Sequence, residues 1–170
     1  SIFSFFGTIV GIAVIGGAVL LVAQLVLEGD LLKRWDATQL AEGGAVALRR
    51  RISTPHDYDG LIRTLVALVQ GAESELGSRG TVGMAIPGTE AIDSGLIKNA
   101  NTTYLNGKAL RRDLETALAR PVRLANDANC FALSEASDGA AAGASTVFGV
   151  IAGTGVGGGI VIDGKVIGGA

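Results

Sequence analysis

Apolar residues recur along residues 45–170 with the two spacings that distinguish helices from strands. Residues three or four positions apart predict two amphipathic helices, one carrying Leu61, Leu65, Leu68, Ala72 and Leu76 and the other carrying Leu110, Leu114 and Leu118. Short apolar runs predict strands at 45–52, 81–86, 122–125, 146–152, 159–162 and 165–167. Helices that alternate with strands in this way indicate an α/β domain.

Capping and turn residues support these boundaries. Asp57 or Asp59 can cap the first helix, because a carboxylate accepts hydrogen bonds from the free N–H groups of a first helical turn. An alanine-rich stretch predicts a third helix over 128–143. Asp163-Gly164 is a typical turn sequence for a β-hairpin and precedes the last strand.

Residues 1–27 differ from the rest because they contain no charged side chain. An apolar run longer than about 20 residues can cross a bilayer as a helix, so we favour a membrane-type helix. Buried strands and foreign sequence joined to this chain are alternatives, whereas a signal peptide would carry Lys or Arg ahead of the run. We therefore expect an apolar segment at 1–30, a polar, turn-rich linker at 31–44 and the α/β domain at 45–170.

The composition of the 170 residues narrows the class of partner. Hydrophobic residues make up 48% and charged residues 18%, which indicates a globular chain with a core. The net charge of −2 and the lack of a basic face argue against nucleic acid as the main partner. The triplet Arg49-Arg50-Arg51 is short for a binding patch, so we interpret it as the solvated end of a strand.

Cys130 is the single cysteine, so it forms neither an internal disulfide nor a metal cluster with other cysteines. It lies in an apolar run, which favours a buried, unreactive thiol. The alternative is a nucleophile, but His56, the only histidine, is far away in the sequence.

Asn126 and Asp127 offer a carboxylate and an amide side by side. Partial burial beside Leu124 and Cys130 would raise the basicity of Asp127, which would help it to accept a proton from a sugar hydroxyl. The Asn126 amide can donate and accept hydrogen bonds to orient the same molecule. The alternative is that Asp127 only caps the following helix, and both roles are compatible.

A glycine-rich segment follows about 25 residues later and consists of Gly153, Thr154, Gly155, Val156, Gly157, Gly158 and Gly159. The backbone N–H groups of such a turn can bind phosphate oxygens, and the alternative is a plain hairpin loop. A dinucleotide-binding loop is excluded because an apolar strand follows where a helix is needed. A P-loop is excluded because Val166 follows Lys165 where Ser or Thr should bind magnesium.

Four stretches, at 79–88, 98–107, 124–135 and 149–159, occur together in one order. Residues 45–170, which contain them, resemble the N-terminal part of a ROK-family sugar kinase, of the fructokinase or mannokinase type first and the N-acetylglucosamine kinase type next. The resemblance implies an actin-like ATPase fold, ATP and Mg²⁺ as cosubstrates, a hexose acceptor, a cytoplasmic kinase and, for a complete family member, a homodimer.

The resemblance also assigns roles to single residues. Asp127 resembles the catalytic base and Asn126 a sugar ligand, while Gly88 and Asn101 are expected near the sugar. Residues 153–159 resemble the second phosphate loop of the family.

Two departures from the family pattern affect the expected activity. The family opens with a strand and an Asp-x-Gly-Gly-Thr-Lys phosphate loop, but here the pair Gly16-Gly17 is preceded by Val14 instead of the aspartate. The family's Glu-x-x-His sugar ligands, its cysteine-rich zinc site and its C-terminal ATP lobe are expected beyond Ala170. We therefore expect this chain, taken by itself, to transfer phosphate weakly or not at all.

Two other functions remain as alternatives to a hexose kinase acting on fructose or mannose. One is a sugar-binding module without catalysis, tethered to a membrane through residues 1–27. The other is a ROK-type transcriptional repressor, which is disfavoured because no basic helix-turn-helix precedes the domain.

Overall fold

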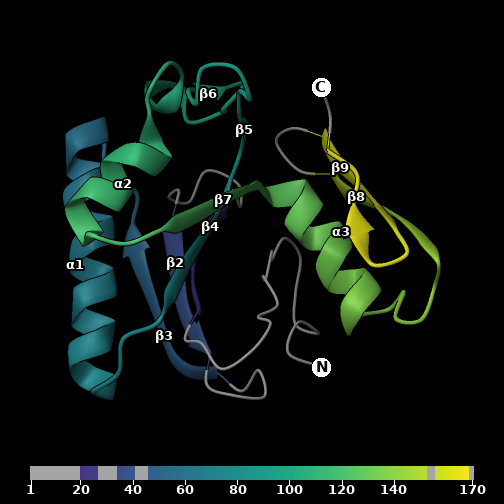
Figure 1. Cartoon of the computed structure of the whole chain (residues 1–170), viewed down its shortest axis with the longest axis horizontal. Helices are drawn as coiled ribbons and strands as arrows, with labels where there is room; N and C mark the ends of the chain where they lie inside the picture. The colour runs from purple at the N-terminus through teal and green to yellow at the C-terminus, as the bar shows by residue number, and fades with distance from the viewer. Residues whose placement is uncertain (1–19, 27–33, 41–45, 153–155, 169–170) are drawn as a thin grey trace.

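The structure of the protein is a computed structural model that describes residues 20–26, 34–40, 46–152 and 156–168. Its centre is a five-stranded sheet in the order β3 (Val46–Ser53), β2 (Arg34–Leu40), β1 (Leu20–Val26), β4 (Thr81–Ile86) and β7 (Val122–Asn126). The first three strands are antiparallel neighbours, whereas β1, β4 and β7 run parallel (Figure 1).

Strands β1 and β2 correct the expectations for the N-terminal region. A membrane-type helix through residue 27 is wrong for Leu20–Val26, which pairs with β2 and β4. A linker at 31–44 is wrong for Arg34–Leu40, which pairs with β1 and β3. Residues 1–19 lie outside the described part of the chain. None of the helices in the described ranges has the length and apolar composition needed to cross a membrane.

Helices α1 (Tyr58–Leu76) and α2 (Leu110–Leu118) pack together beside the sheet (Figure 1). Asp57 caps α1, as one of the two predicted caps, and its Oδ1 accepts a hydrogen bond from the Gly60 N–H at 2.7 Å. Gly77 ends the helix in the left-handed conformation, with φ 63°. Of the five predicted apolar positions of α1, only Leu76 is exposed.

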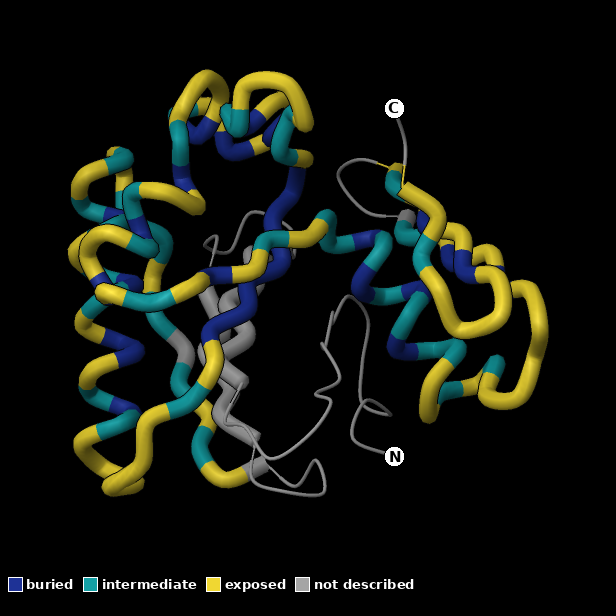
Figure 2. The backbone as a smooth tube through the Cα atoms, in the orientation of Figure 1, coloured by how far each residue is buried: buried dark blue, intermediate teal, exposed yellow. Residues whose placement is uncertain are grey.

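Strand β4 is buried on both faces, as expected for a central parallel strand (Figure 2). Val82, Met84 and Ile86 belong to the core formed with the leucines of α1 and α2. Ala85 belongs to a smaller cluster with Cys130 of the third helix. The strand therefore connects the main core with the part of the chain that follows β7.

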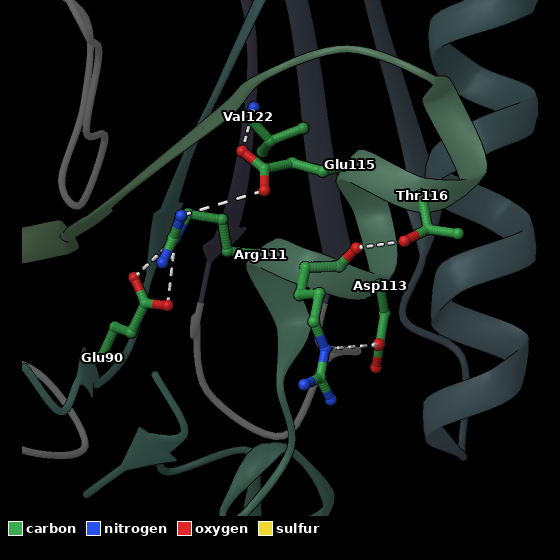
Figure 3. A network of polar contacts seen from close by, with 7 residues as sticks. Glu90, Arg111, Asp113, Glu115, Thr116 and Val122 are labelled. Carbon is green, nitrogen blue, oxygen red and sulfur yellow. Dashed lines mark hydrogen bonds and ion pairs between the residues drawn. The ribbon is translucent and has the colours of Figure 1, made fainter. Parts of the chain in front are cut away.

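Between β4 and α2 the chain forms the short strands β5 (Thr89–Glu90) and β6 (Ile97–Lys98) and a 3₁₀ helix at Thr103–Leu105. Figure 3 shows how this segment is attached to α2: the Arg111 Nε lies 3.0 Å from each carboxylate oxygen of Glu90. The carboxylate of Glu115, one turn further along α2, accepts from the Val122 N–H at 3.1 Å. Helix α2 thus holds both β5 and the start of β7.

Helix α3 (Asp127–Ser137) follows β7 directly and packs on a second sheet in the order β10 (Lys165–Val166), β9 (Val156–Ile162) and β8 (Thr146–Ala152) (Figure 1). The predicted hairpin turn is confirmed, with positive φ at Asp163 and Gly164. The predicted extension of the helix to residue 143 is wrong. The chain turns after Ser137, where the Glu135 carboxylate accepts from the Ala140 N–H at 2.8 Å.

Candidate functional site

The candidate site lies where the parallel strands β4 and β7 end side by side. Ile86 and Asn126 are partners in the register of these two strands. The chain continues from them as Pro87-Gly88 on one side and as Asp127 on the other. Ligands of open α/β sheets bind outside the carboxyl ends of the strands, so this edge is where a small molecule is expected.

Asn126 joins the two strand ends through its side chain. Its Oδ1 accepts from the N–H groups of Ala128 (3.1 Å) and Asn129 (3.2 Å), so Asn126 rather than Asp127 is the cap of α3. Its Nδ2 donates to the Gly88 carbonyl at 3.1 Å and to the Asp127 carboxylate at 3.2 Å. The amide is therefore fixed in orientation at the centre of the edge.

Asp127 is the first residue of α3 and is half-buried. Its Oδ1 accepts from the Ala128 N–H at 2.8 Å and from Asn126, while its Oδ2 receives no hydrogen bond from another described residue. Burial raises the pKa of this carboxyl above its ordinary value, because desolvation of the charged form outweighs the hydrogen bonds that lower it. The predicted gain in basicity is thus present, and one oxygen is available to a proton donor.

Gly88 lies against the loop that follows β6. A Cβ built on Gly88 would lie 2.9 Å from the Ala100 Cα and 2.9 Å from the Lys98 carbonyl oxygen, so only glycine fits here. The Asn101 N–H donates to the Pro87 carbonyl at 3.1 Å. Gly88 and the backbone of Asn101 therefore lie at the same edge as Asn126.

The described part of the glycine segment is a strand. Residues 153–155 lie outside the described part of the chain, and Val156–Ile162 is strand β9, so the expected loop over 153–159 is wrong for its second half. A Cβ on Gly159 would lie 2.6 Å from the Ala128 carbonyl oxygen, and one on Gly157 would lie 3.2 Å from the Ala128 Cβ. These two glycines let β9 pack against the first turn of α3, directly beside Asp127.

The space that Gly157 and Gly159 leave is occupied by the first turn of α3. In the ranges that the structure describes, no group of three or more His, Cys, Asp or Glu side chains could hold a metal ion.

Strand β1 changes the position at which the family's opening phosphate loop is expected in this chain. Gly16-Gly17 precedes β1, whereas the family's loop follows its opening strand. The residues between β1 and β2 read Leu-Glu-Gly-Asp-Leu-Leu-Lys and contain no Gly-Gly pair. The departure from the family pattern therefore persists at this position.

Cys130 is a structural thiol, as predicted. It is 5% exposed and packs with Ala85, and burial raises the pKa of its thiol to about 12. A thiol with so high a pKa carries no useful fraction of thiolate near neutrality.

A sequence model described as the ROK family matches residues 36–170. This chain belongs to the ROK family. The match begins inside β2, so the ROK domain starts before the predicted boundary at 45. The expected fold is also confirmed, because solved ROK structures share it.

Two solved ROK structures superpose over 88% of this chain. The ROK hexokinase from Thermus thermophilus is 32% identical, with a TM-score of 0.68, and the aligned region covers 49% of that chain. A ROK glucokinase from Streptomyces griseus, solved in complex with glucose and AMPPNP, is 27% identical, with a TM-score of 0.72 and 47% of that chain covered.

Curated relatives share more sequence with this ROK chain. Proteins named N-acetyl-D-glucosamine kinase from Vibrio cholerae and Photobacterium profundum are 49% and 48% identical over 120 residues, which is 70% of this chain. The chain spans about 40% of the length of these relatives.

Asn106 lies beside the candidate site and was not singled out from the sequence of this ROK chain. Its amide bonds to the backbone of Ala100, six residues earlier, in the loop beside Gly88. The sequence shows only one more amide in a polar loop. The pairing depends on the loop conformation, and no motif spacing signals it.

Proposed function

We propose that the protein to which this chain belongs transfers the γ-phosphoryl group of ATP to a hexose, with N-acetylglucosamine as the preferred acceptor and Asp127 as the base. The observation that carries this proposal is the Asp127 carboxylate at the end of β7, half-buried, with a raised pKa and one oxygen without a partner among the described residues. A base at the edge where ligands of α/β sheets bind is the arrangement that proton removal from a bound hydroxyl requires.

N-acetylglucosamine is proposed because of the named relatives. Proteins 48–49% identical to this chain bear the name N-acetyl-D-glucosamine kinase, whereas the sequence resemblance placed fructose and mannose first. The glucokinase bound to glucose is more distant, at 27% identity. Fructose, mannose and glucose are therefore the comparison acceptors.

The residues of this chain act on the acceptor. Asn126 is held by Gly88 and by the first turn of α3, so its orientation is set before a sugar binds. The acceptor hydroxyl gives its proton to Asp127 Oδ2 as its oxygen attacks phosphorus. ATP supplies the phosphoryl group and Mg²⁺ neutralises its charge, as the family implies.

The test is sugar-dependent ADP formation by the protein that carries this chain. We expect turnover with N-acetylglucosamine to exceed that with fructose, mannose or glucose. The Asp127→Asn variant should lower kcat on the order of 10²–10⁴-fold with little change in KM, since a general base contributes about that much. Turnover that Asp127→Asn leaves unchanged, or ADP formation that no hexose stimulates, would contradict the proposal.

A second candidate is a sugar-binding module without catalysis. It is favoured by one observation: neither the residues around Gly16-Gly17 nor residues 27–33 reproduce the family's Asp-x-Gly-Gly-Thr-Lys phosphate loop. The same assay distinguishes the two functions, because such a module would bind the hexose and form no ADP above background.

A further inference from the structure

The side-chain amide of Asn106 makes two hydrogen bonds to Ala100, in the loop beside the edge where β4 and β7 end. Its Oδ1 accepts from the Ala100 N–H at 2.8 Å, and its Nδ2 donates to the Ala100 carbonyl at 3.1 Å. The amide therefore uses both its donor and its acceptor, as a backbone peptide group does when it pairs with a neighbouring strand. The backbone of Ala100 is fixed in position and in rotation by this single side chain.

Ala100 is the residue on which Gly88 rests. It is 5% exposed, and its Cα and Cβ would lie 2.9 and 3.0 Å from a Cβ on Gly88. A displacement of Ala100 is therefore felt at Gly88. The Gly88 carbonyl in turn accepts from Asn126, which also donates to Asp127. A continuous path of contacts leads from Asn106 to the base.

Asn101, the residue after Ala100, is also hydrogen-bonded at this edge. The Asn101 N–H reaches the Pro87 carbonyl at 3.1 Å, and Asn101 is a candidate sugar ligand. On its other side, Asn99 has a φ of 57°, in the left-handed region that an asparagine adopts at some cost.

We propose that Asn106 is a positioning residue of the hexose site: its two hydrogen bonds to Ala100 set the distance between the Asn101 side of the edge and the Gly88–Asn126 side. This role rests on the function proposed above. Asn106 acts through Ala100 and touches neither the sugar nor the base.

Loss of the Asn106 amide is expected to release this position without unfolding the loop. The Ile97 backbone still bonds to residues 107 and 108, at 2.8 and 2.9 Å. The Tyr104 hydroxyl still donates to the Pro55 carbonyl at 3.0 Å. The variants therefore report on the alignment of the edge.

The test is the affinity of the protein that carries this chain for N-acetylglucosamine, followed by two-dimensional NMR, in wild type, Asn106→Ala and Asn106→Asp. Asparagine and aspartate have nearly the same shape, but the carboxylate lacks the donor and repels the Ala100 carbonyl. Both variants should bind about tenfold more weakly, which corresponds to about 1.4 kcal/mol. If Asn106 only filled space, Asn106→Asp would bind like wild type.

Amide hydrogen exchange gives a readout that needs no sugar. Exchange at Asn101 should become at least about tenfold faster in both variants. Thr116→Ala is the matched control, because it also removes a bond from a side chain to the backbone, to Arg112 at 2.8 Å on α2. It should leave affinity and Asn101 exchange at wild-type values.

Each outcome decides a separate point. Wild-type affinity or wild-type Asn101 exchange in Asn106→Asp would overturn the role of Asn106 while the proposed function stands. A wild-type protein that binds no hexose would overturn the proposed function and, with it, this role. If Asn106→Ala does not fold, the comparison of Asn106→Asp with Thr116→Ala decides alone.

Discussion

At the residue scale, Asn126 caps α3 and Asp127 keeps a carboxylate oxygen for proton acceptance, whereas the sequence suggested both roles for Asp127. Asn126 caps α3 and ties it to Gly88, so all of its polar atoms are engaged. Asp127 is thereby released from capping and keeps Oδ2 without a partner among the described residues. The raised pKa of Asp127 is the consequence of holding a carboxylate in this half-buried place.

The raised pKa makes a prediction about stability. At pH values between the ordinary pKa of 3.8 and the raised pKa, the folded state binds more protons than the unfolded state. The free energy of unfolding therefore falls as the pH rises through this range. Asp127→Asn should therefore be more stable than wild type in urea unfolding at pH 7.5, and the difference should shrink at pH 4. The exposed Asp93→Asn serves as the control. A variant less stable than wild type at pH 7.5 would contradict this account.

Gly88 makes a second prediction at this scale. Its missing Cβ lets Ala100 approach, so Gly88→Ala must push the backbone of residues 98–100 away. The expected cost is about 1–3 kcal/mol of unfolding free energy, typical of an overpacked position, together with weaker hexose binding. Gly168→Ala is the matched control, because a Cβ there meets nothing within 4 Å. Equal stability of the two variants in thermal unfolding would show that Gly88 is not crowded.

At the scale of elements, glycines set how closely α3 lies on the second sheet. Gly149 on β8 and Gly159 on β9 face the helix, where a Cβ would lie 2.8 Å from the Ala132 Cβ and 2.6 Å from the Ala128 carbonyl oxygen. Residue 158 points to the opposite face, beside the exposed Phe148. The glycine run therefore serves helix packing in its second half.

Substitutions at two neighbouring glycines of β9 test whether Gly159 is needed for packing against α3. Gly159→Ala should lower the unfolding free energy by about 1–3 kcal/mol or more, because its nearest neighbours are backbone atoms that cannot turn aside. Gly158→Ala meets the Phe148 ring at 3.1 Å, which can rotate away, and the Gly149 carbonyl oxygen at an ordinary contact distance of 3.5 Å, so it should cost less. Chemical denaturation of both variants measures the difference. Equal costs would mean that α3 does not rest on Gly159.

The sequence predicted the elements whose period was clear. The helices around Leu61 and Leu110 and the strands at 81–86 and 146–152 are confirmed, because each repeats its apolar spacing over its whole length. It failed for Leu20–Val26, because an uncharged apolar run looks the same for a buried strand and a membrane helix. It also failed at the end of α3, where alanines favour a helix but local side-chain bonds stop it.

The sequence predicted those residues of the candidate site that belong to a recognisable motif. Asn126, Asp127, Gly88 and the backbone of Asn101 meet at one edge, as the resemblance implied. The hydrogen bonds of Asn106 were not predictable, because they depend on how the chain between β4 and α2 folds back on Gly88. The second half of the glycine segment was expected as a loop and is a strand, because close packing and a phosphate loop favour the same residue.

At the scale of the molecule, the carboxyl ends of β4 and β7 lie where the main sheet is followed by α3 and the second sheet. Ala85 and Cys130 make the small apolar contact between these parts. Arg120 fastens the other end of β4, with bonds to the Glu73 carboxylate at 2.5 Å and to the Gly80 carbonyl at 2.8 Å. The strand that ends at the edge is thus fixed at both of its ends.

The central claim is that a hexose binds at the carboxyl ends of β4 and β7. The most direct test is a titration of the labelled protein that carries this chain with N-acetylglucosamine, read from backbone amide shifts. We predict that the shifts concentrate at Ile86, Gly88, Asn101 and 126–128 and disappear in Asn126→Ala. Shifts that concentrate on β8 to β10, or a titration without any shift, would contradict the account.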